Sequence, residues 1–293
     1  MASIRRRRSV AGLLMTAPAI IAVSLFFFVP LVLVVWISLH RWPILGANKF
    51  LGIDNFVRAF NDEAFISAAS FTALYTVIIT PILFVIGLTL ALLVRRQRRG
   101  VGIFRTVFFL PVVIGLAAAS YIWVWLVQSG IGPLLNIAVW LGLVDSNTNW
   151  LASTQGALGV IVVMITWKAV GMQMLLFMAG LQSIPVELED AAKVDGASRL
   201  QTMLYVFLPL LRPTIVLILV FGVSHSLLAF DQFYIVTGGG PAQSTITAVF
   251  SIYRASFVSF DLGYGSALSL IALVVLAIVS AVQLLLLRNS DND

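Results

Sequence analysis

Long stretches of this sequence carry no charged residue, and this feature constrains the fold more than any other. Residues 11–39 and 64–94 are uncharged. Each stretch exceeds the roughly 20 apolar residues that a helix needs to cross a bilayer. Hydrophobic residues make up 60% of the chain and charged residues only 10%, against about 25% charged residues in ordinary soluble domains. A soluble globular fold is therefore excluded, and the chain is predicted to be an all-α integral membrane protein.

The same criterion predicts six membrane spans. The apolar run at 106–144 is too long for one crossing, and the polar and turn-forming residues at 128–133 divide it into a span and a short interfacial helix. The fourth and fifth spans contain ionisable side chains. The predicted spans are residues 11–39, 64–94, 106–127, 155–181, 213–236 and 262–287, and the interfacial helix is at 134–144.

The distribution of basic residues predicts the orientation. With the N-terminus in the cytoplasm, thirteen Lys and Arg residues lie inside and four lie outside, which satisfies the positive-inside rule. Residues 1–10, with Arg5 to Arg8, then form a cytoplasmic basic segment, residues 11–287 the membrane domain, and residues 288–293 a cytoplasmic tail. A cleaved signal peptide is the alternative for the N-terminus. The apolar run is far longer than a signal-peptide core and lacks a clear cleavage site.

The net charge of +6 fits loops that face an anionic membrane surface. No pattern of stacking aromatic residues indicates nucleic acid binding. The chain has no cysteine and two histidines, His40 and His225, so we expect neither a disulfide framework nor a metal site.

The predicted cytoplasmic loop at 182–212 is unusual because it holds four of the twelve acidic residues. Pro185 suits the first turn of a helix at 185–200, with Ser183 or Ile184 as its cap, and acidic residues follow near its N-terminus. Gly196 lies inside this helix, so either the chain bends there or another surface approaches the backbone. A solvated connecting helix is the simpler interpretation of the charges.

The loop resembles the EAA loop of permease subunits of ABC importers. The similarity lies in Glu-Asp-Ala-Ala-Lys-Val-Asp-Gly-Ala at 189–197 and Val-Phe-Leu-Pro at 206–209. Asp190 stands where the family usually has Glu, and Val206 where it usually has Ile. In that family the loop forms a coupling helix on the ATPase subunit, and small residues permit close packing there. The coupling residues that the resemblance implies are Glu189, Asp190, Ala191, Ala192, Gly196, Leu208 and Pro209.

Three other segments, at 52–56, 104–111 and 237–241, are similar to the carbohydrate-uptake branch of this family, typified by maltose and glycerol-phosphate importers. The resemblance covers essentially the whole chain. It implies a six-helix type I ABC importer permease fold in the inner membrane of a prokaryote, with both termini cytoplasmic. The implied partners are a second homologous permease, an ATPase dimer, an extracytoplasmic solute-binding protein and a carbohydrate substrate. ATP and Mg²⁺ belong to the ATPase, and this chain binds no cofactor.

Polar residues within the spans are candidates for a substrate path, because ionisable groups in the membrane are costly. Lys168 lies near the middle of the fourth span, and a structural role, by snorkelling or by pairing with Asp231, is the alternative. The fifth span is rich in polar and aromatic residues, and the helical period places His225, Leu228 and Gln232 roughly on one stripe, with Asp231 beside it. We expect this stripe to face the interior of the bundle. A lone histidine in a span is, however, more often an interhelical hydrogen-bond partner than a ligand contact. The path candidates are Lys168, Met172, Gln173, His225, Leu228, Asp231 and Gln232.

The glycine-rich segment Gly238, Gly239, Gly240 and Pro241 lacks the Lys-Ser/Thr of a phosphate-binding loop and lies outside the cell in the predicted topology. A tight turn is the simplest interpretation, and the resemblance implies a docking loop for the solute-binding protein. No Walker, zinc-protease or nucleophile-elbow motif is present, so we expect no enzyme activity. The alternatives are an ion-coupled secondary solute carrier using Lys168 and Asp231, or a membrane-embedded enzyme using His225 and Asp231.

Overall fold

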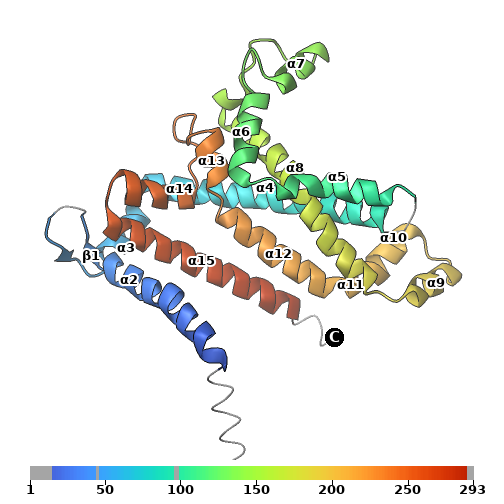
Figure 1. The fold of residues 1–293 in the computed structure, drawn as a ribbon, viewed down its shortest axis with the longest axis horizontal. Coiled ribbons are helices and arrows are strands. Elements are labelled where there is room, and N and C mark those ends of the chain that lie inside the picture. The colour runs from blue at the N-terminus through green and yellow to red at the C-terminus, as the bar shows by residue number, and fades with distance from the viewer. Residues whose placement is uncertain (1–14, 44–45, 96–98, 289–293) are drawn as a thin grey trace, which may run out of the picture. The chain divides into compact units, whose positions relative to one another are not determined.

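The computed structural model describes residues 15–43, 46–95 and 99–288, and side chains as far as residue 285. Helices dominate the described part of the chain (Figure 1). Contacts divide it into two compact units: Met1–Asp62 with Ile252–Leu273, and Glu63–Ser251 with Val274–Asp293. The predicted basic segment at 1–10 and residues 289–293 of the predicted tail lie outside the described residues, as do Arg96 and Arg98.

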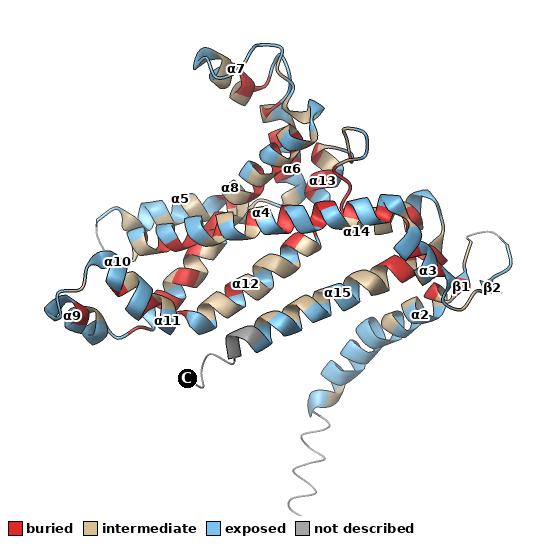
Figure 2. Ribbon diagram, turned by 180° about the vertical axis from the view of Figure 1, so that it is seen from behind, coloured by how far each residue is buried: buried red, intermediate tan, exposed pale blue. Residues whose placement is uncertain are grey.

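The first unit begins with an apolar helix at Met15–Ser38. The elements of this unit are η1 (Ser24–Phe28), α2 (Val29–Ser38), β1 (His40–Arg41), β2 (Lys49–Phe50), α3 (Asp54–Asn61), η4 (Arg254–Val258) and the first part of α15 (Leu262–Arg288). The two strands pair antiparallel, with His40 opposite Phe50 and Arg41 opposite Lys49. Most residues of α2 are exposed, and only Ser38 of this helix is buried (Figure 2). An apolar helix with so little protein cover requires lipid or another subunit around it.

Hydrogen bonds stabilise the segment that follows α2. The buried Asn55 side chain donates to the carbonyls of Ser38, at 2.8 Å, and His40, at 3.0 Å, and so closes the turn after α2. The guanidinium of Arg58 pairs with Asp261 at 2.7 Å. These contacts join the segment before α15 to the segment after α2.

The second unit contains the remaining helices. They are α4 (Glu63–Val94), α5 (Val101–Val113), α6 (Leu116–Leu126), α7 (Pro133–Trp140), η2 (Trp150–Ala152), α8 (Thr154–Gln182), α9 (Val186–Val194), α10 (Arg199–Gln201), η3 (Thr202–Phe207), α11 (Leu208–Leu210), α12 (Arg212–Leu227), α13 (Asp231–Val236) and α14 (Ala248–Tyr253). α8 packs against α4, α5 and α12 and forms the centre of this unit.

Small residues let the helices around α8 approach closely. The backbone of α5 at Phe108 lies directly against Gly171 of α8, where a Cβ atom would collide with the Phe108 carbonyl oxygen. On α4, a Cβ atom at Gly87 would stand 2.7 Å from the Cβ of Gln173. Such contacts are typical of membrane helices, which associate through close packing rather than through the hydrophobic effect.

Each of the six predicted spans has a counterpart in the structure. Four described helices are long and apolar enough to cross a membrane: Met15–Ser38, Glu63–Val94, Thr154–Gln182 and Leu262–Leu285. Two bent helix pairs, Val101–Val113 with Leu116–Leu126 and Arg199–Leu210 with Arg212–Leu227, bring the number to six if each pair is one span. A helix is confirmed in the segment predicted at 134–144: α7 begins at Pro133 and ends at Trp140, while the interfacial position stays a prediction.

The prediction of one continuous helix was wrong for two of the six spans. The third bends by 98° between α5 and α6, where Ile114 and Gly115 adopt extended conformations. The fifth, predicted at 213–236, is interrupted between Leu227 and Asp231. At both interruptions, the freed carbonyl groups accept hydrogen bonds from side chains of other segments. The hydrophobic periodicity within one segment cannot reveal such contacts.

Candidate functional site

α9 is the short helix of the EAA loop. Glu187 and Glu189 lie in its first turn and Lys193 in its last turn, which is the order of charges that the helix dipole favours. The predicted helix at 185–200 is therefore confirmed as far as Val194 and is wrong beyond it.

Gly196 ends α9 because its backbone adopts the left-handed conformation, with φ of +76°. The amide of Gly196 donates to the carbonyl of Lys193 at 3.1 Å, and that of Ala197 donates to Ala192 at 2.9 Å. These two bonds form a Schellman motif. No heavy atom lies within 4 Å of the position of a Cβ atom at Gly196, so the glycine serves the turn and not packing within this chain.

The two alanines of the EAA loop differ in their surroundings. Ala192 is buried against the rest of the unit, whereas Ala191 is exposed. Three large apolar side chains of the loop are also exposed: Val186 is 61%, Val194 87% and Leu200 67% accessible. Because Glu187, Asp190 and Lys193 are exposed as well, the loop presents a surface of mixed apolar and charged character that this chain does not cover.

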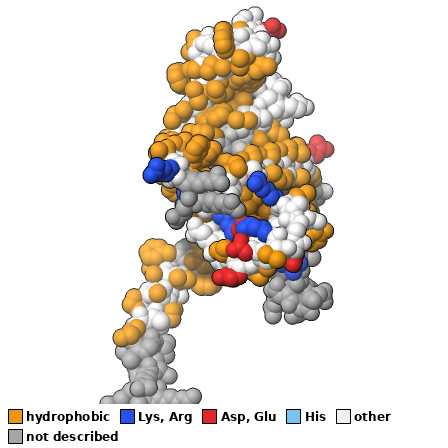
Figure 3. All heavy atoms as spheres, turned by 90° about the vertical axis from the view of Figure 1, so that its right-hand side faces the viewer, with side chains coloured by type: hydrophobic (Ala, Val, Ile, Leu, Met, Phe, Trp, Pro, Cys, Tyr) orange, Lys and Arg blue, Asp and Glu red, His pale blue; other side chains and the backbone are white. Residues whose placement is uncertain are grey.

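Acidic and basic side chains pair along α9. The Lys193 ammonium lies 2.8 Å from Asp190 and 3.3 Å from Glu189. These hydrogen bonds, first to Asp190 and then to Glu189, raise the pKa of Lys193. Figure 3 faces this end of the unit and shows acidic and basic side chains side by side on a largely uncharged surface.

Glu189 also makes an ion pair with a residue that sequence reasoning treated only as a topology signal. Arg95, directly after α4, donates from Nη2 to Glu189 Oε2 at 2.8 Å, and both side chains are largely buried. The Arg95 guanidinium carbon lies 4.5 Å from the centre of the Phe207 ring. No pattern in the sequence relates Arg95 to Glu189, because the two positions meet only in the tertiary structure.

Leu208 and Pro209 form the start of α11, directly before the second bend. Leu208 packs against the hydrophobic core that Phe177, Leu181 and Leu211 help to form. The helical segment through Leu210 and α12 then meet at 74°. Of the predicted coupling residues, Leu208 thus contacts the core, while Asp190, Ala191 and Gly196 lie at the surface.

Lys168 lies at the bend between α5 and α6. Its ammonium donates to the carbonyls of Ile114, at 2.7 Å, and Val112, at 3.4 Å. Both carbonyls belong to the C-terminal end of α5, where the helical partners are missing and a cation is favourable. Among the described residues no ion pair joins Lys168 to Asp231, so the pairing suggested from the sequence is wrong.

The predicted polar stripe of the fifth span is divided by the break after α12. His225 and Leu228 are exposed on this chain, as is Asp231. Gln232 is instead buried in the core, where Tyr75 is its hydrogen-bond partner. The stripe drawn on a continuous helix was therefore wrong.

A threonine that sequence reasoning missed stabilises this break. The Thr247 hydroxyl donates to the carbonyl of Ala229 at 2.7 Å and accepts the amide of Phe250 at 3.2 Å. Thr247 is fully buried. It lies after the glycine-rich turn, and no local signal in the sequence relates it to the break.

Met172 and Gln173 occupy different environments on α8. Met172 is exposed, whereas the Gln173 side chain lies between Gly87 of α4 and Gly222 of α12. The amide oxygen Oε1 of Gln173 is buried and has no hydrogen-bond partner among the described residues. A buried amide oxygen of this kind is expected to bind a ligand or water.

The glycine-rich segment forms a packed turn. Gly238 and Gly239 have positive φ angles, and the hydroxyl of Thr245 donates to the carbonyl of Gly240 at 2.6 Å. Thr245 and Thr237 share a second hydrogen bond of 2.8 Å, and Thr245 is fully buried. The interpretation of Gly238, Gly239, Gly240 and Pro241 as a turn is thus confirmed.

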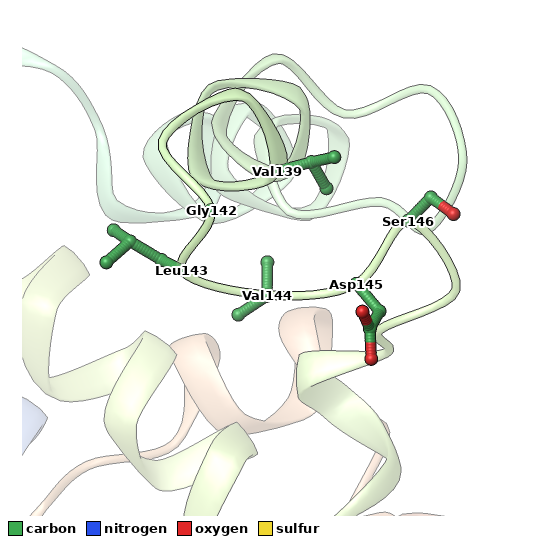
Figure 4. Close-up of a pocket in the computed structure, with 6 residues that line it drawn as sticks. All are labelled: Val139, Gly142, Leu143, Val144, Asp145 and Ser146. Carbon is green, nitrogen blue, oxygen red and sulfur yellow. The ribbon is translucent and has the colours of Figure 1, made fainter.

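Two concave features of the described surface do not gather reactive groups. The first pocket has a volume of about 530 Å³ and lies at the C-terminal end of α7. The side chains of Val139, Val144 and Asp145 around it do not converge (Figure 4). Another, of about 420 Å³, is largely apolar and includes Trp123 and Trp150. The described residues contain no group of three or more His, Cys, Asp or Glu side chains that could hold a metal ion.

Comparison with known protein families finds one match that spans most of the chain. Residues 84–291 match the model of the binding-protein-dependent transport system inner membrane component.

Individual relatives are similar over nearly their full length. The chain is 33% identical to the multiple sugar-binding transport system permease protein MsmF of Streptococcus mutans, over 94% of this chain and 93% of that protein. It is 29% identical to the probable starch degradation products transport system permease protein AmyD of Thermoanaerobacterium thermosulfurigenes, over 95% and 94%. It is 33% identical to the sulfoquinovosyl glycerol transport system permease protein SmoG of Agrobacterium fabrum, over 96% and 91%.

Two solved structures have a similar fold. One is a chain of a bacterial ABC transporter involved in the import of the acidic polysaccharide alginate, with a TM-score of 0.83, 23% identity and 98% coverage of both chains. The other is a chain of a bacterial alginate ABC transporter in complex with an alginate pentasaccharide-bound periplasmic protein. It has a TM-score of 0.82 and 22% identity, and covers 96% of this chain and 94% of that one.

Proposed function

Because the chain belongs to the family of inner membrane components of binding-protein-dependent transport systems, we propose that it is one of two homologous membrane subunits of an ATP-driven sugar importer. Its fold is the type I permease fold of ABC importers. The relatives named above are permease proteins of transport systems for multiple sugars, starch degradation products and sulfoquinovosyl glycerol, which supports a carbohydrate substrate.

The observation that carries the proposal is the uncovered surface of the EAA loop. Val186, Ala191, Val194 and Leu200 are exposed on it, together with charged side chains of α9. An uncovered patch of this kind marks a protein interaction site. An ATPase subunit is the occupant that accounts for it, and that subunit supplies the ATP and Mg²⁺. Glu189, Asp190, Ala191, Ala192, Gly196, Leu208 and Pro209 are proposed as the coupling residues.

The substrate path is proposed to follow the exposed polar side of α12 and α13. His225 and Asp231 are exposed in a segment at membrane depth, and such groups must face protein or a water-filled cavity rather than lipid. A second permease facing this side would enclose the path. Met172 and Gln173 on α8 are further candidates for the path. Lys168 and Gln232 are proposed to shape the path indirectly, because they hold α5 and α13 in position.

The mechanism that we propose is alternating access. Closure of the ATPase pair moves α9, the spans change from an inward-facing to an outward-facing arrangement, and the cavity receives solute from the binding protein. The turn at Gly238, Gly239, Gly240 and Pro241 is the proposed docking loop for that protein. We place both termini and the EAA loop in the cytoplasm, in line with the positive-inside rule.

A secondary carrier would use Lys168 and Asp231 as its coupling pair, but the Lys168 ammonium is engaged by backbone carbonyls of α5. A membrane-embedded enzyme would use His225 with Asp231, and no hydrogen bond joins these two side chains among the described residues.

The test is purification of the tagged chain from its native membrane in mild detergent, followed by mass spectrometry and by sugar uptake into proteoliposomes. We expect an ATPase and a second permease to co-purify, and uptake to require ATP and the binding protein. Recovery of the chain alone, with uptake driven by an ion gradient, would overturn the proposal.

A further inference from the structure

Arg95 joins three separate elements at one end of the second unit. It follows the last residue of α4, pairs with Glu189 of α9 at 2.8 Å and lies over the Phe207 ring of η3 at 4.5 Å. Phe207 itself belongs to the hydrophobic core that contains Leu88, Ala91 and Val94 of α4. The guanidinium therefore connects the polar surface of α9 with the packed interior below it.

The ion pair is more strongly shielded than its neighbours. The side chains of Arg95 and Glu189 are 17% and 13% accessible, against 52% for Lys193, which approaches the same carboxylate at 3.3 Å. Exposed pairs contribute little, whereas removing one partner of a shielded pair leaves a charge without compensation. Arg95, rather than Lys193, is thus the partner that fixes the position of Glu189.

The end of α4 is also held from its other side. Arg105 of α5 donates from Nη2 to the carbonyl of Val94 at 2.6 Å. This bond satisfies a free carbonyl at the C-terminal end of α4. The backbone next to Arg95 is therefore fixed, so a displacement of Glu189 is transmitted to α4 rather than absorbed by a loose helix end.

We propose that Arg95 is a positioning residue that holds α9 to the end of α4, so that the two helices move as one body when the ATPase closes. The inference rests on the proposed function. Its consequence concerns coupling: without this contact α9 follows the ATPase while α4 does not, and ATP is hydrolysed without solute movement.

The test uses the complete transporter in proteoliposomes and measures solute transported per ATP hydrolysed. In Arg95→Gln and in Glu189→Gln we expect this ratio to fall by about fivefold or more, the lower end of typical coupling between sites. The matched control is Lys193→Gln, which removes the exposed partner of the same carboxylate and is expected to leave the ratio unchanged. A ratio in Arg95→Gln equal to that of the wild type would overturn the proposal.

A second variant separates coupling from folding. The chain has no cysteine, so the pair Arg95→Cys with Glu189→Cys can be joined by a short thiol crosslinker. We expect the crosslinked protein to recover transport per ATP, and release of the crosslink to lower it again. Loss of transport on crosslinking would show that the helices must separate, and would overturn the proposal. A wild-type complex that neither transports nor hydrolyses ATP would count against the proposed function itself.

Discussion

The ammonium of Lys168 on α8 donates to the carbonyl of Ile114 at 2.7 Å, at the 98° bend between α5 and α6. The charged side chain on α8 thereby stabilises the break between α5 and α6. A helix that stops inside a membrane leaves carbonyl groups without partners, and these are costly in an apolar surrounding. One lysine donates to two of them, which gives this basic residue a structural role at the bend.

Replacement of Lys168 by Met is expected to destabilise the bend. Two carbonyls lose a charged donor, and each buried unsatisfied polar group costs about 1–3 kcal/mol. The thermal unfolding temperature of the purified protein in detergent should fall, while the KM for the transported sugar should stay the same. An altered KM at unchanged unfolding temperature would place Lys168 in the substrate path instead.

Replacement of Gly196 by Val should impair coupling without unfolding the bundle. A side chain at φ of +76° is strained, at a cost of about 1–2 kcal/mol, and this strain falls on the turn that ends α9. We expect sugar uptake to be largely lost, while thermal stability falls only by the amount of this local strain. Gly100 is the matched control, because it also has a positive φ, of +90°, and open space around it. Equal loss of uptake in Gly100→Val would argue against a specific role of the turn.

Replacement of Gly171 by Ala should destabilise the packing of α5 on α8. The added methyl group would collide with the Phe108 carbonyl oxygen, and overpacking of this kind costs about 1–3 kcal/mol. On the same helix, Gly159 has no atom within 4 Å of the Cβ position. Gly159→Ala should therefore be neutral or stabilising, by up to about 1 kcal/mol. Unfolding in detergent compares the two, and equal stability would contradict the proposed contact.

Replacement of Thr247 by Val should destabilise the break between α12 and α13. The variant keeps the side-chain shape but leaves the carbonyl of Ala229 without its donor, at a cost of about 1–3 kcal/mol. Limited proteolysis and the unfolding temperature both report this change. Thr89→Val is the control, since the exposed Thr89 hydroxyl bonds only to its own helix, at Val85. Similar effects of the two substitutions would show that the bond from Thr247 is not important.

The membrane-spanning segments were predictable because transfer of a helix into lipid depends on composition. The uncharged runs that end at Leu39 and Val94 correspond to helices in the structure, whose C-terminal ends agree with the prediction within a residue. The short helix α7 and the start of α9 were also predictable, since proline at a first turn and the order of charges act locally. The place where α9 ends was not, because Gly196 was accepted within the helix rather than at its C-terminus.

The structure places the predicted site residues in different environments. These environments depend on contacts between residues that are far apart in the sequence. His225 and Asp231 are exposed, whereas Gln232 is buried next to Tyr75. The difference arises because the break after Leu227 rotates α13 out of the register of α12. A single period of 3.6 residues cannot describe two helices with different directions.

The sequence by itself determined that this chain is a membrane protein and which family it resembles, and it predicted six crossings, each with a helical counterpart in the structure. These properties depend on apolar length, charge and short motifs, which act over a few neighbouring residues. Only the tertiary structure decided that Lys168 stabilises the bend at Ile114, that Thr247 stabilises the break after α12, and that Arg95 holds Glu189. These contacts join residues far apart in the chain, so their existence depends on how the helices pack and not on local composition.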